Sequence, residues 1–270
     1  MNAPEGRTFE FTGDGRVRRD GNRVRWDVPP DGGQLRWRVR VDRLRGDRYD
    51  ARMTTDWALL RIDHLFPAAH VSTRERERSR STLELQGPAG WAFETRYGRI
   101  EEAVALPGSE RRFVRPTGWM MAGKLGVRRD TIAGRKVVVA GPRGERLRSQ
   151  DILALLRWTL PELVTLLPHF PDRLLIVNAG DPMWRGGLSG PGSLYLHSAR
   201  PLISADGSST PVHELVHVGT SSEANPGNDW IVEGLAEFYS IELLRRSGTV
   251  GAWRARRTFA SFEARARRGK

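Results

Sequence analysis

The sequence of 270 residues contains no cysteine, which excludes a disulfide scaffold and a metal site built from thiolates. It also lacks an apolar run long enough to span a bilayer, so we expect no transmembrane segment. Residues 1–12 are mostly polar and do not resemble a signal peptide. We therefore expect a cytoplasmic protein if the sequence is complete as numbered, and a protein of the cell envelope or a secreted one if a leader was removed.

Clustering of basic residues is also missing, although the net charge is +12. The arginines are scattered through the whole sequence. Between Leu35 and Val41, for example, arginine alternates with apolar residues, as on the solvent face of a half-buried strand. A nucleic-acid footprint needs clustered charge, so we expect no specific nucleic acid as a partner. Net charge alone would still support weak attraction to anionic surfaces.

Histidine is scarce as well, but two of the six histidines fall in the stretch His213-Glu214-Leu215-Val216-His217. On a helix, positions i and i+4 share a face, so His213 and His217 can hold one metal ion. Glu214 is turned by about 100° from His213 around the helix axis. Its carboxylate would lie beside the position that a catalytic zinc site keeps open for water.

A second predicted helix supplies further carboxylates. Glu233 would complete a set of two histidines and one glutamate around Zn²⁺. Glu237 lies one helical turn later on the same face, where it could hold the second ring nitrogen of a ligand histidine. The alternative is a pair of amphipathic helices with ordinary surface histidines and a solvated Glu237.

Local signals set the expected limits of these helices. Thr210 is a suitable N-cap, Pro211 suits the first helical position, and the first helix should end by Gly219. Residues 220–228 have the composition of a loop. The second helix should run from Asp229 to about Arg246. Its buried side is expected to carry these apolar residues: Ile231, Leu235, Phe238 and Ile241 or Leu243.

The sequence predicts an α+β protein with two domains. Residues 1–115 contain short strand patterns separated by turns, which favours an antiparallel β-sandwich module. Residues 116–270 alternate strand and helix patterns. The elements expected in the second domain, ahead of the two helices described above, are strands at 136–140, 174–178 and 193–197 and a helix at about 150–167.

The block from His213 to Tyr239 resembles the gluzincin metallopeptidases, such as thermolysin and aminopeptidase N. It is most similar to the glycyl aminopeptidase family, in which H-E-x-x-H is followed by a W-x-x-E-G-x-x-x-[FY]-Y helix. The resemblance implies a thermolysin-like domain with a mixed sheet, a zinc ion, a peptide or protein substrate, and Glu214 as general base. It also implies a cleft-edge strand at Ser193–His197, with Ser193, Tyr195 and His197 as substrate-binding candidates.

The sequence departs from these families at two points. The expected edge strand has no glutamate for a substrate's amino group, so aminopeptidase and endopeptidase activity both stay open. Residues 247–270 hold no tyrosine or histidine to stabilise an oxyanion, and the carboxyl-terminal part is shortened. Tyr195, Tyr239 and Arg185 are the candidates to replace that group. The alternative function is a catalytically inactive gluzincin-fold protein that binds or scaffolds.

Overall fold

The computed structural model describes residues 10–21, 23–72, 79–108, 111–145, 147–221 and 229–268. The sequence pattern also predicts a strand at residues 7–12, and the first part of this strand lies outside the described ranges. Most of the loop expected at residues 220–228 lies outside them as well. Within them, no helix combines the length and the apolar character needed to cross a bilayer.

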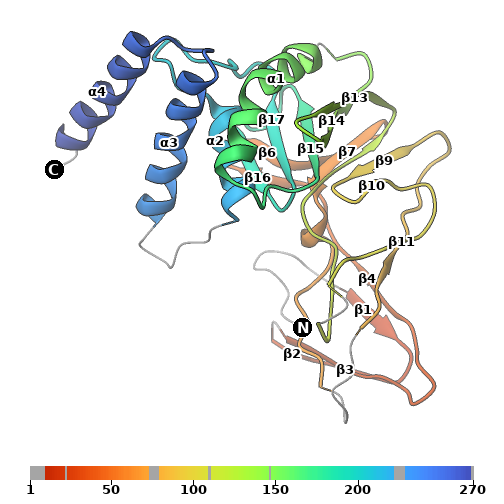
Figure 1. Cartoon of the computed structure of the whole chain (residues 1–270). Coiled ribbons are helices and arrows are strands. Elements are labelled where there is room, and N and C mark those ends of the chain that lie inside the picture. Colours follow the sequence, from red (N-terminus) through yellow and green to blue (C-terminus); the bar gives the residue numbers. More distant parts are fainter. Residues whose placement is uncertain are drawn as a thin grey trace.

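The amino-terminal part is built from antiparallel strands (Figure 1). A six-stranded sheet has the order β10-β9-β12-β7-β6-β5, and three two-stranded ladders join β1 to β4, β2 to β3 and β8 to β11. The short helix η1 spans Ile62–His64. The strands of the six-stranded sheet are β5 (Arg43–Arg45), β6 (Arg48–Met53), β7 (Trp57–Arg61), β9 (Ala92–Thr95), β10 (Gly98–Arg99) and β12 (Trp119–Gly123). The strands of the ladders are β1 (Glu10–Gly13), β2 (Arg16–Asp20), β3 (Arg23–Asp27), β4 (Leu35–Arg38), β8 (Thr82–Leu83) and β11 (Val104–Ala105).

A second, mixed sheet of five strands has the order β13-β14-β15-β17-β16. Strands β14, β15 and β17 run parallel, while β13 and β16 pair antiparallel at the two edges. The strands are β13 (Leu125–Ile132), β14 (Arg135–Pro142), β15 (Arg173–Ala179), β16 (Gly187–Gly190) and β17 (Ser193–His197). Because β16 closes the sheet on one side, the edge expected of Ser193–His197 belongs to β16, and β17 lies inside the sheet.

Four helices are described: α1 (Ser149–Leu166), α2 (Thr210–Thr220), α3 (Asp229–Arg246) and α4 (Ala252–Arg268). Figure 1 shows α1 and α2 against the five-stranded sheet, α3 beside α2, and α4 farther out. On α3, Ile241 and Leu243 are buried as expected. The prediction was wrong for Ile231, Leu235 and Phe238, which are 44%, 50% and 50% exposed. The buried side of α3 is instead formed by Ala236, Ser240, Ile241, Leu243 and Leu244.

Strand alternation divides the five-stranded sheet between two cores. On one face, Val137, Val139, Ile176 and neighbouring side chains pack with the helices. On the other face, Val138, Val177 and their neighbours pack against Trp119 and Met121 of β12. Successive side chains of a strand point to opposite faces, and both faces are covered here. This explains why β14 and β15 are apolar almost without interruption.

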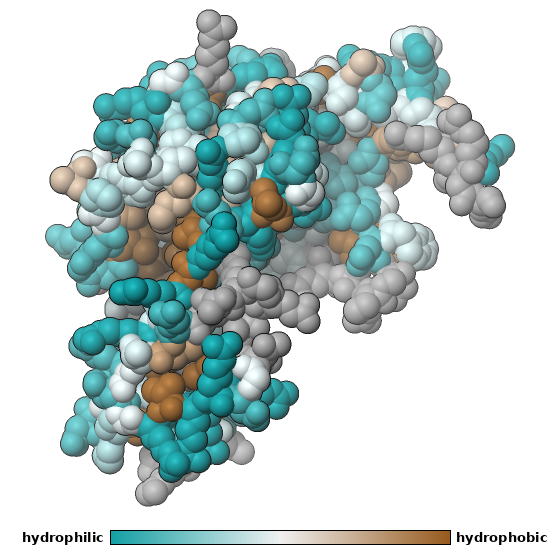
Figure 2. Space-filling model, turned by 180° about the vertical axis from the view of Figure 1, so that it is seen from behind, coloured by the Kyte–Doolittle hydropathy of each residue, from teal (hydrophilic) through white to brown (hydrophobic). Residues whose placement is uncertain are grey.

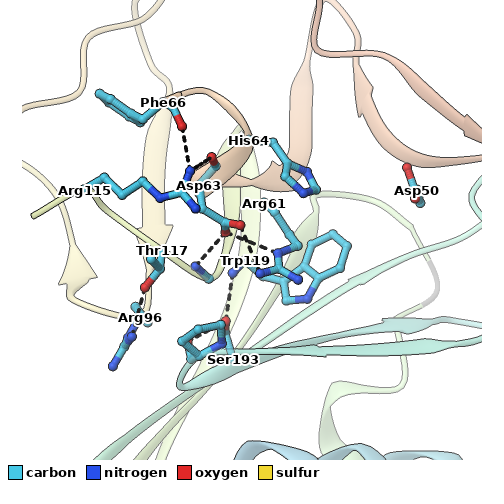
Figure 3. Close-up of polar contacts among 12 residues, drawn as sticks. Asp50, Arg61, Asp63, His64, Phe66, Arg96, Arg115, Thr117, Trp119 and Ser193 are labelled. Atoms are coloured by element: carbon cyan, nitrogen blue, oxygen red, sulfur yellow. Dashed lines mark hydrogen bonds and ion pairs between the residues drawn. The ribbon is translucent and has the colours of Figure 1, made fainter. Parts of the chain in front are cut away.

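Polar contacts also join the two sheets. The backbone N–H of Trp119 donates to Oγ of Ser193 at 2.8 Å (Figure 3). Next to it, Asp63 accepts from the N–H of Gly118 and from Arg61. Trp119 opens β12, which pairs with β7 and β9. Gly123 is therefore the last residue of the six-stranded sheet, and the next strand, β13, belongs to the five-stranded sheet. This change of sheet lies beyond residue 115, where the division between two domains was expected, and that division remains a prediction.

The α+β class and the mixed sheet are confirmed.

Figure 2 shows the opposite face of the molecule. This face is mostly hydrophilic, and its hydrophobic residues gather in small separate patches. Such patches are ordinary for a folded chain of this size.

Candidate metal centre

Helix α2 carries the H-E-x-x-H stretch and begins one residue earlier than expected. Ser209 is its N-cap, with extended backbone and an Oγ that accepts from the N–H of Val212, and Thr210 is already helical. Pro211 occupies the first turn, where its missing N–H costs nothing. The helix ends at Thr220, and Ser221 adopts the left-handed conformation that closes it.

Three side chains converge in front of α2. Nε2 of His213 lies 3.0 Å from Nε2 of His217 and 3.1 Å from Oε2 of Glu233. The other oxygen of Glu233 lies 3.5 Å from Nε2 of His217. Ligand atoms placed tetrahedrally around one ion, with bonds of about 2.0–2.1 Å, lie roughly 3.3 Å apart. Two imidazoles and one carboxylate with these separations fit a zinc ion, and all three ligand atoms fall within 4.8 Å of one another.

Glu237 holds the far side of the first histidine. Its Oε2 lies 3.0 Å from Nδ1 of His213, so Nδ1–H donates to the carboxylate when Nε2 faces the ion. Burial works to lower the pKa of His213. The hydrogen bond to Glu237 and the nearby glutamates outweigh it and raise that pKa. Burial lowers the pKa of His217, and the neighbouring His213 adds to this.

Glu214 is not one of the three side chains whose ligand atoms converge. It is only 9% exposed and interacts with the backbone and side chain of Ser189 on β16. Burial raises the pKa of this carboxyl, while His213 and the hydrogen bonds from Ser189 oppose the rise. A buried carboxylate beside an electrophilic centre, with a raised pKa, is suited to accept and return a proton.

Four of these side chains, those of His213, Glu214, Glu233 and Glu237, line one cleft of about 630 Å³. His217 joins them through its contacts with His213 and Glu233. The walls of the cleft come from β16, the segment before α2, α2 itself, α3, and Phe262 of α4. A cavity of this size accommodates a ligand of a few residues. Five of the residues expected at the site lie together here: His213, Glu214, His217, Glu233 and Glu237.

The other three expected site residues do not line the cleft. Ser193, Tyr195 and His197 occupy alternate positions of β17, so they share the face that packs against the amino-terminal sheet, opposite the helices. Ser193 and Tyr195 are fully buried, and His197 is 1% exposed. Nδ1 of His197 accepts from the N–H of Ala199, and its Nε2 lies 3.5 Å from Asp181. The burial of these side chains on the face opposite the cleft argues against the expectation that they bind substrate.

The three residues considered for oxyanion stabilisation all have other contacts in the structure. The hydroxyl of Tyr195 donates to the carbonyl of Trp184 inside the core. Tyr239 packs its ring against Phe238 and the helix core. Arg185 does line the cleft, but its Nε and one terminal nitrogen donate to Asp181.

The sequence reading missed the contribution of β16. The sequence patterns predict no strand between residues 178 and 193, yet Gly187–Gly190 pairs antiparallel with β17. The signal was present, because Gly190-Pro191-Gly192 is a turn between two short segments, as in a hairpin. Arg200 and Thr210 also line the cleft, and neither was expected at the site.

Comparison with known proteins gives structural likeness only. No family model matches the chain, and no curated protein matches it. Among solved structures, an aminopeptidase N family protein from Idiomarina loihiensis has a TM-score of 0.67 at 14% identity, covering 92% of this chain and 47% of its own. A two-domain M1 zinc metallopeptidase variant bound to L-arginine gives a TM-score of 0.58 at 14% identity, covering 98% and 66%. An M1 zinc metallopeptidase from Deinococcus radiodurans gives 0.54 at 13% identity, covering 96% and 64%.

The chain has a gluzincin-like metallopeptidase fold. It spans about half of the first of these structures and just under two thirds of the other two. The narrower resemblance to glycyl aminopeptidases remains a prediction.

Proposed function

We propose that this protein is a zinc-dependent peptide hydrolase. The observation that carries the proposal is the convergence of His213, His217 and Glu233 at separations that suit one tetrahedral ion, with Glu214 buried beside them. The gluzincin-like fold supports it, since zinc metallopeptidases are among the structures with this fold.

Bound zinc would supply a Lewis acid that polarises a carbonyl and lowers the pKa of water. His213, His217 and Glu233 would hold the ion, and Glu237 fixes the ring of His213 through Nδ1. Glu214 takes a proton from the attacking water and passes it to the leaving amine. Its hydrogen bonds from Ser189 keep the carboxylate in place between these two transfers.

The free edge of β16 is the surface that we assign to the substrate backbone. An extended peptide can add to an exposed sheet edge through main-chain hydrogen bonds. Ser189 lies on this strand and touches the general base, so a peptide bound along β16 would pass Glu214.

A binding or scaffolding protein with the same fold is the second candidate. It is favoured by the oxyanion candidates, since Tyr195 is buried in the core and Arg185 is tied to Asp181. Such a protein would hold the ion without turnover.

Two measurements on the purified full chain decide between these functions. Metal analysis should give close to one zinc per chain, and a panel of peptides and aminoacyl substrates should show hydrolysis that a chelator removes and zinc restores. A chain that takes up no zinc when zinc is supplied would refute the metal centre. Zinc at full occupancy with no turnover, and no loss of function in Glu214→Gln, would favour the binding protein.

A further inference from the structure

We propose that Arg200 recognises a carboxylate group of the substrate, which makes short peptides with such a group the preferred substrates. The inference rests on the proposed function, because it concerns the same cleft. Arg200 follows β17, and its backbone N–H donates to the carbonyl of His197 at 3.0 Å. Its side chain lines the cleft together with His213, Glu214 and Glu233.

One hydrogen bond fixes the direction of this side chain. Nε of Arg200 donates to Oγ1 of Thr210 at 2.9 Å. Thr210 opens α2 and lies one helical turn before Glu214, so the two residues share a face of the helix. The guanidinium is therefore held on the same side of α2 as the general base. Among the described residues, no hydrogen bond engages its terminal nitrogens, which form the fork that binds a carboxylate with two parallel hydrogen bonds.

The other charged groups of the cleft already have partners. Arg185 is paired with Asp181, which also binds Arg48. Asp206 accepts from the N–H and the hydroxyl of Ser208. The three glutamates of the cleft surround the metal centre. Of the two arginines that line the cleft in the described part of the chain, Arg200 is the one with no carboxylate partner.

The dimensions of the cleft limit what this cation can reach. A volume of about 630 Å³ holds a few residues of an extended chain. A carboxylate bound by Arg200 therefore belongs to a residue close to the scissile bond. It is either the free carboxyl terminus of a short peptide or the side chain of an aspartate or glutamate.

Matched peptides separate these two sources. One pair has the same sequence with a free carboxyl terminus or a terminal amide, and a second, amidated pair carries glutamate or glutamine beside the scissile bond. Both pairs are assayed with the parent protein, Arg200→Gln and Arg200→Lys. The control is Arg40→Gln, which removes the same charge from an exposed position in the amino-terminal part.

We expect the parent to favour the carboxylate member of one pair by roughly tenfold in kcat/KM, the scale of a charged hydrogen bond at a solvent-accessible site. The preference should lie mainly in KM. Arg200→Gln should abolish it, Arg200→Lys should keep part of it, and Arg40→Gln should leave it unchanged. The peptide pair in which the parent shows this preference identifies the carboxylate as either the free carboxyl terminus or the acidic side chain.

Equal kcat/KM for both members of both pairs in the parent would overturn the proposal, as would an unchanged preference in Arg200→Gln. Affinities of the same peptides, labelled with a fluorophore, are also measured on zinc-loaded Glu214→Gln, with and without Arg200→Gln. If the parent hydrolyses no peptide, the proposed function fails, and these affinities alone decide about Arg200. Peptides that bind equally well with and without the carboxylate, or do not bind, would refute its role.

Discussion

A single methyl group added at Gly187 should disable the proposed catalytic cleft while leaving the proposed metal ligands untouched. Gly187 opens β16 and faces α2. A Cβ at this position would lie 2.7 Å from Cγ2 of Thr210 and 2.9 Å from Cγ of Glu214. Carbon atoms in normal contact are about 3.5 Å apart, so β16 and α2 would have to separate by roughly 0.6–0.8 Å.

That displacement acts directly on Glu214, the proposed general base, because this side chain contacts both Gly187 and Ser189 of β16. Misplacement of a catalytic group by about 1 Å can cost on the order of a hundredfold in rate. We therefore expect Gly187→Ala to lower kcat/KM by about ten- to a hundredfold and to destabilise the fold by about 1–3 kcal/mol. Zinc content should stay at the parent's value, since no ligand is contacted.

Gly234→Ala is the matched control. Gly234 follows the ligand Glu233 on α3, and nothing lies within 4 Å of a Cβ built there. Alanine inside a helix is favoured over glycine by about 0.5–1 kcal/mol, so this variant should melt at or above the parent's temperature and keep its activity. Peptide kinetics, zinc analysis and thermal unfolding measure the three expectations. Parent-like kcat/KM in Gly187→Ala would show that β16 and Glu214 are not packed as described.

The metal centre gives three further predictions. Glu214→Gln should keep zinc and the fold but lower turnover by at least about a hundredfold, the scale of a lost general base, and unchanged kinetics would assign the base elsewhere. His217→Ala should lose zinc on dialysis, because it removes one of three protein ligands, whereas full occupancy by metal analysis would exclude His217 from the set. Glu237→Ala should weaken zinc affinity by roughly ten- to a hundredfold in a chelator competition, and an affinity equal to the parent's would mean that the ring of His213 is held by another group.

The metal-binding helices could be predicted from sequence because their signals are local. Helical spacing alone places His213 and His217 on one face, and α3 matches the expected range of Asp229–Arg246. The mixed sheet was implied by the resemblance to gluzincins, and the apolar strand patterns alternating with a helix agree with it. For these elements, the apolar periodicity and the capping, proline and glycine residues at their ends agree with the tertiary structure.

The missed features depend on contacts between distant segments. Whether β16 or β17 forms the sheet edge is decided by pairing, which a glycine-rich strand of four residues hardly signals. The burial of α3 likewise depends on which of its side chains meet the core, and the apolar spacing of Leu235 and Phe238 carries no information on this. Arg200 reaches the cleft only because the segment after β17 brings it back to Thr210.

The core shared by the two sheets bears on how this protein could change over evolution. Trp119 and Met121 of β12 pack with Val138, Val177 and Tyr195 of the mixed sheet. Trp119 is 1% exposed and Met121 is fully buried, so each sheet depends on the other to cover its apolar side chains. A module joined by a linker can be lost or exchanged, but a sheet that forms one wall of its neighbour's core cannot be removed without exposing that core to water. We therefore expect the amino-terminal strands to be under the same selective constraint as the proposed zinc ligands, although they lie outside the cleft.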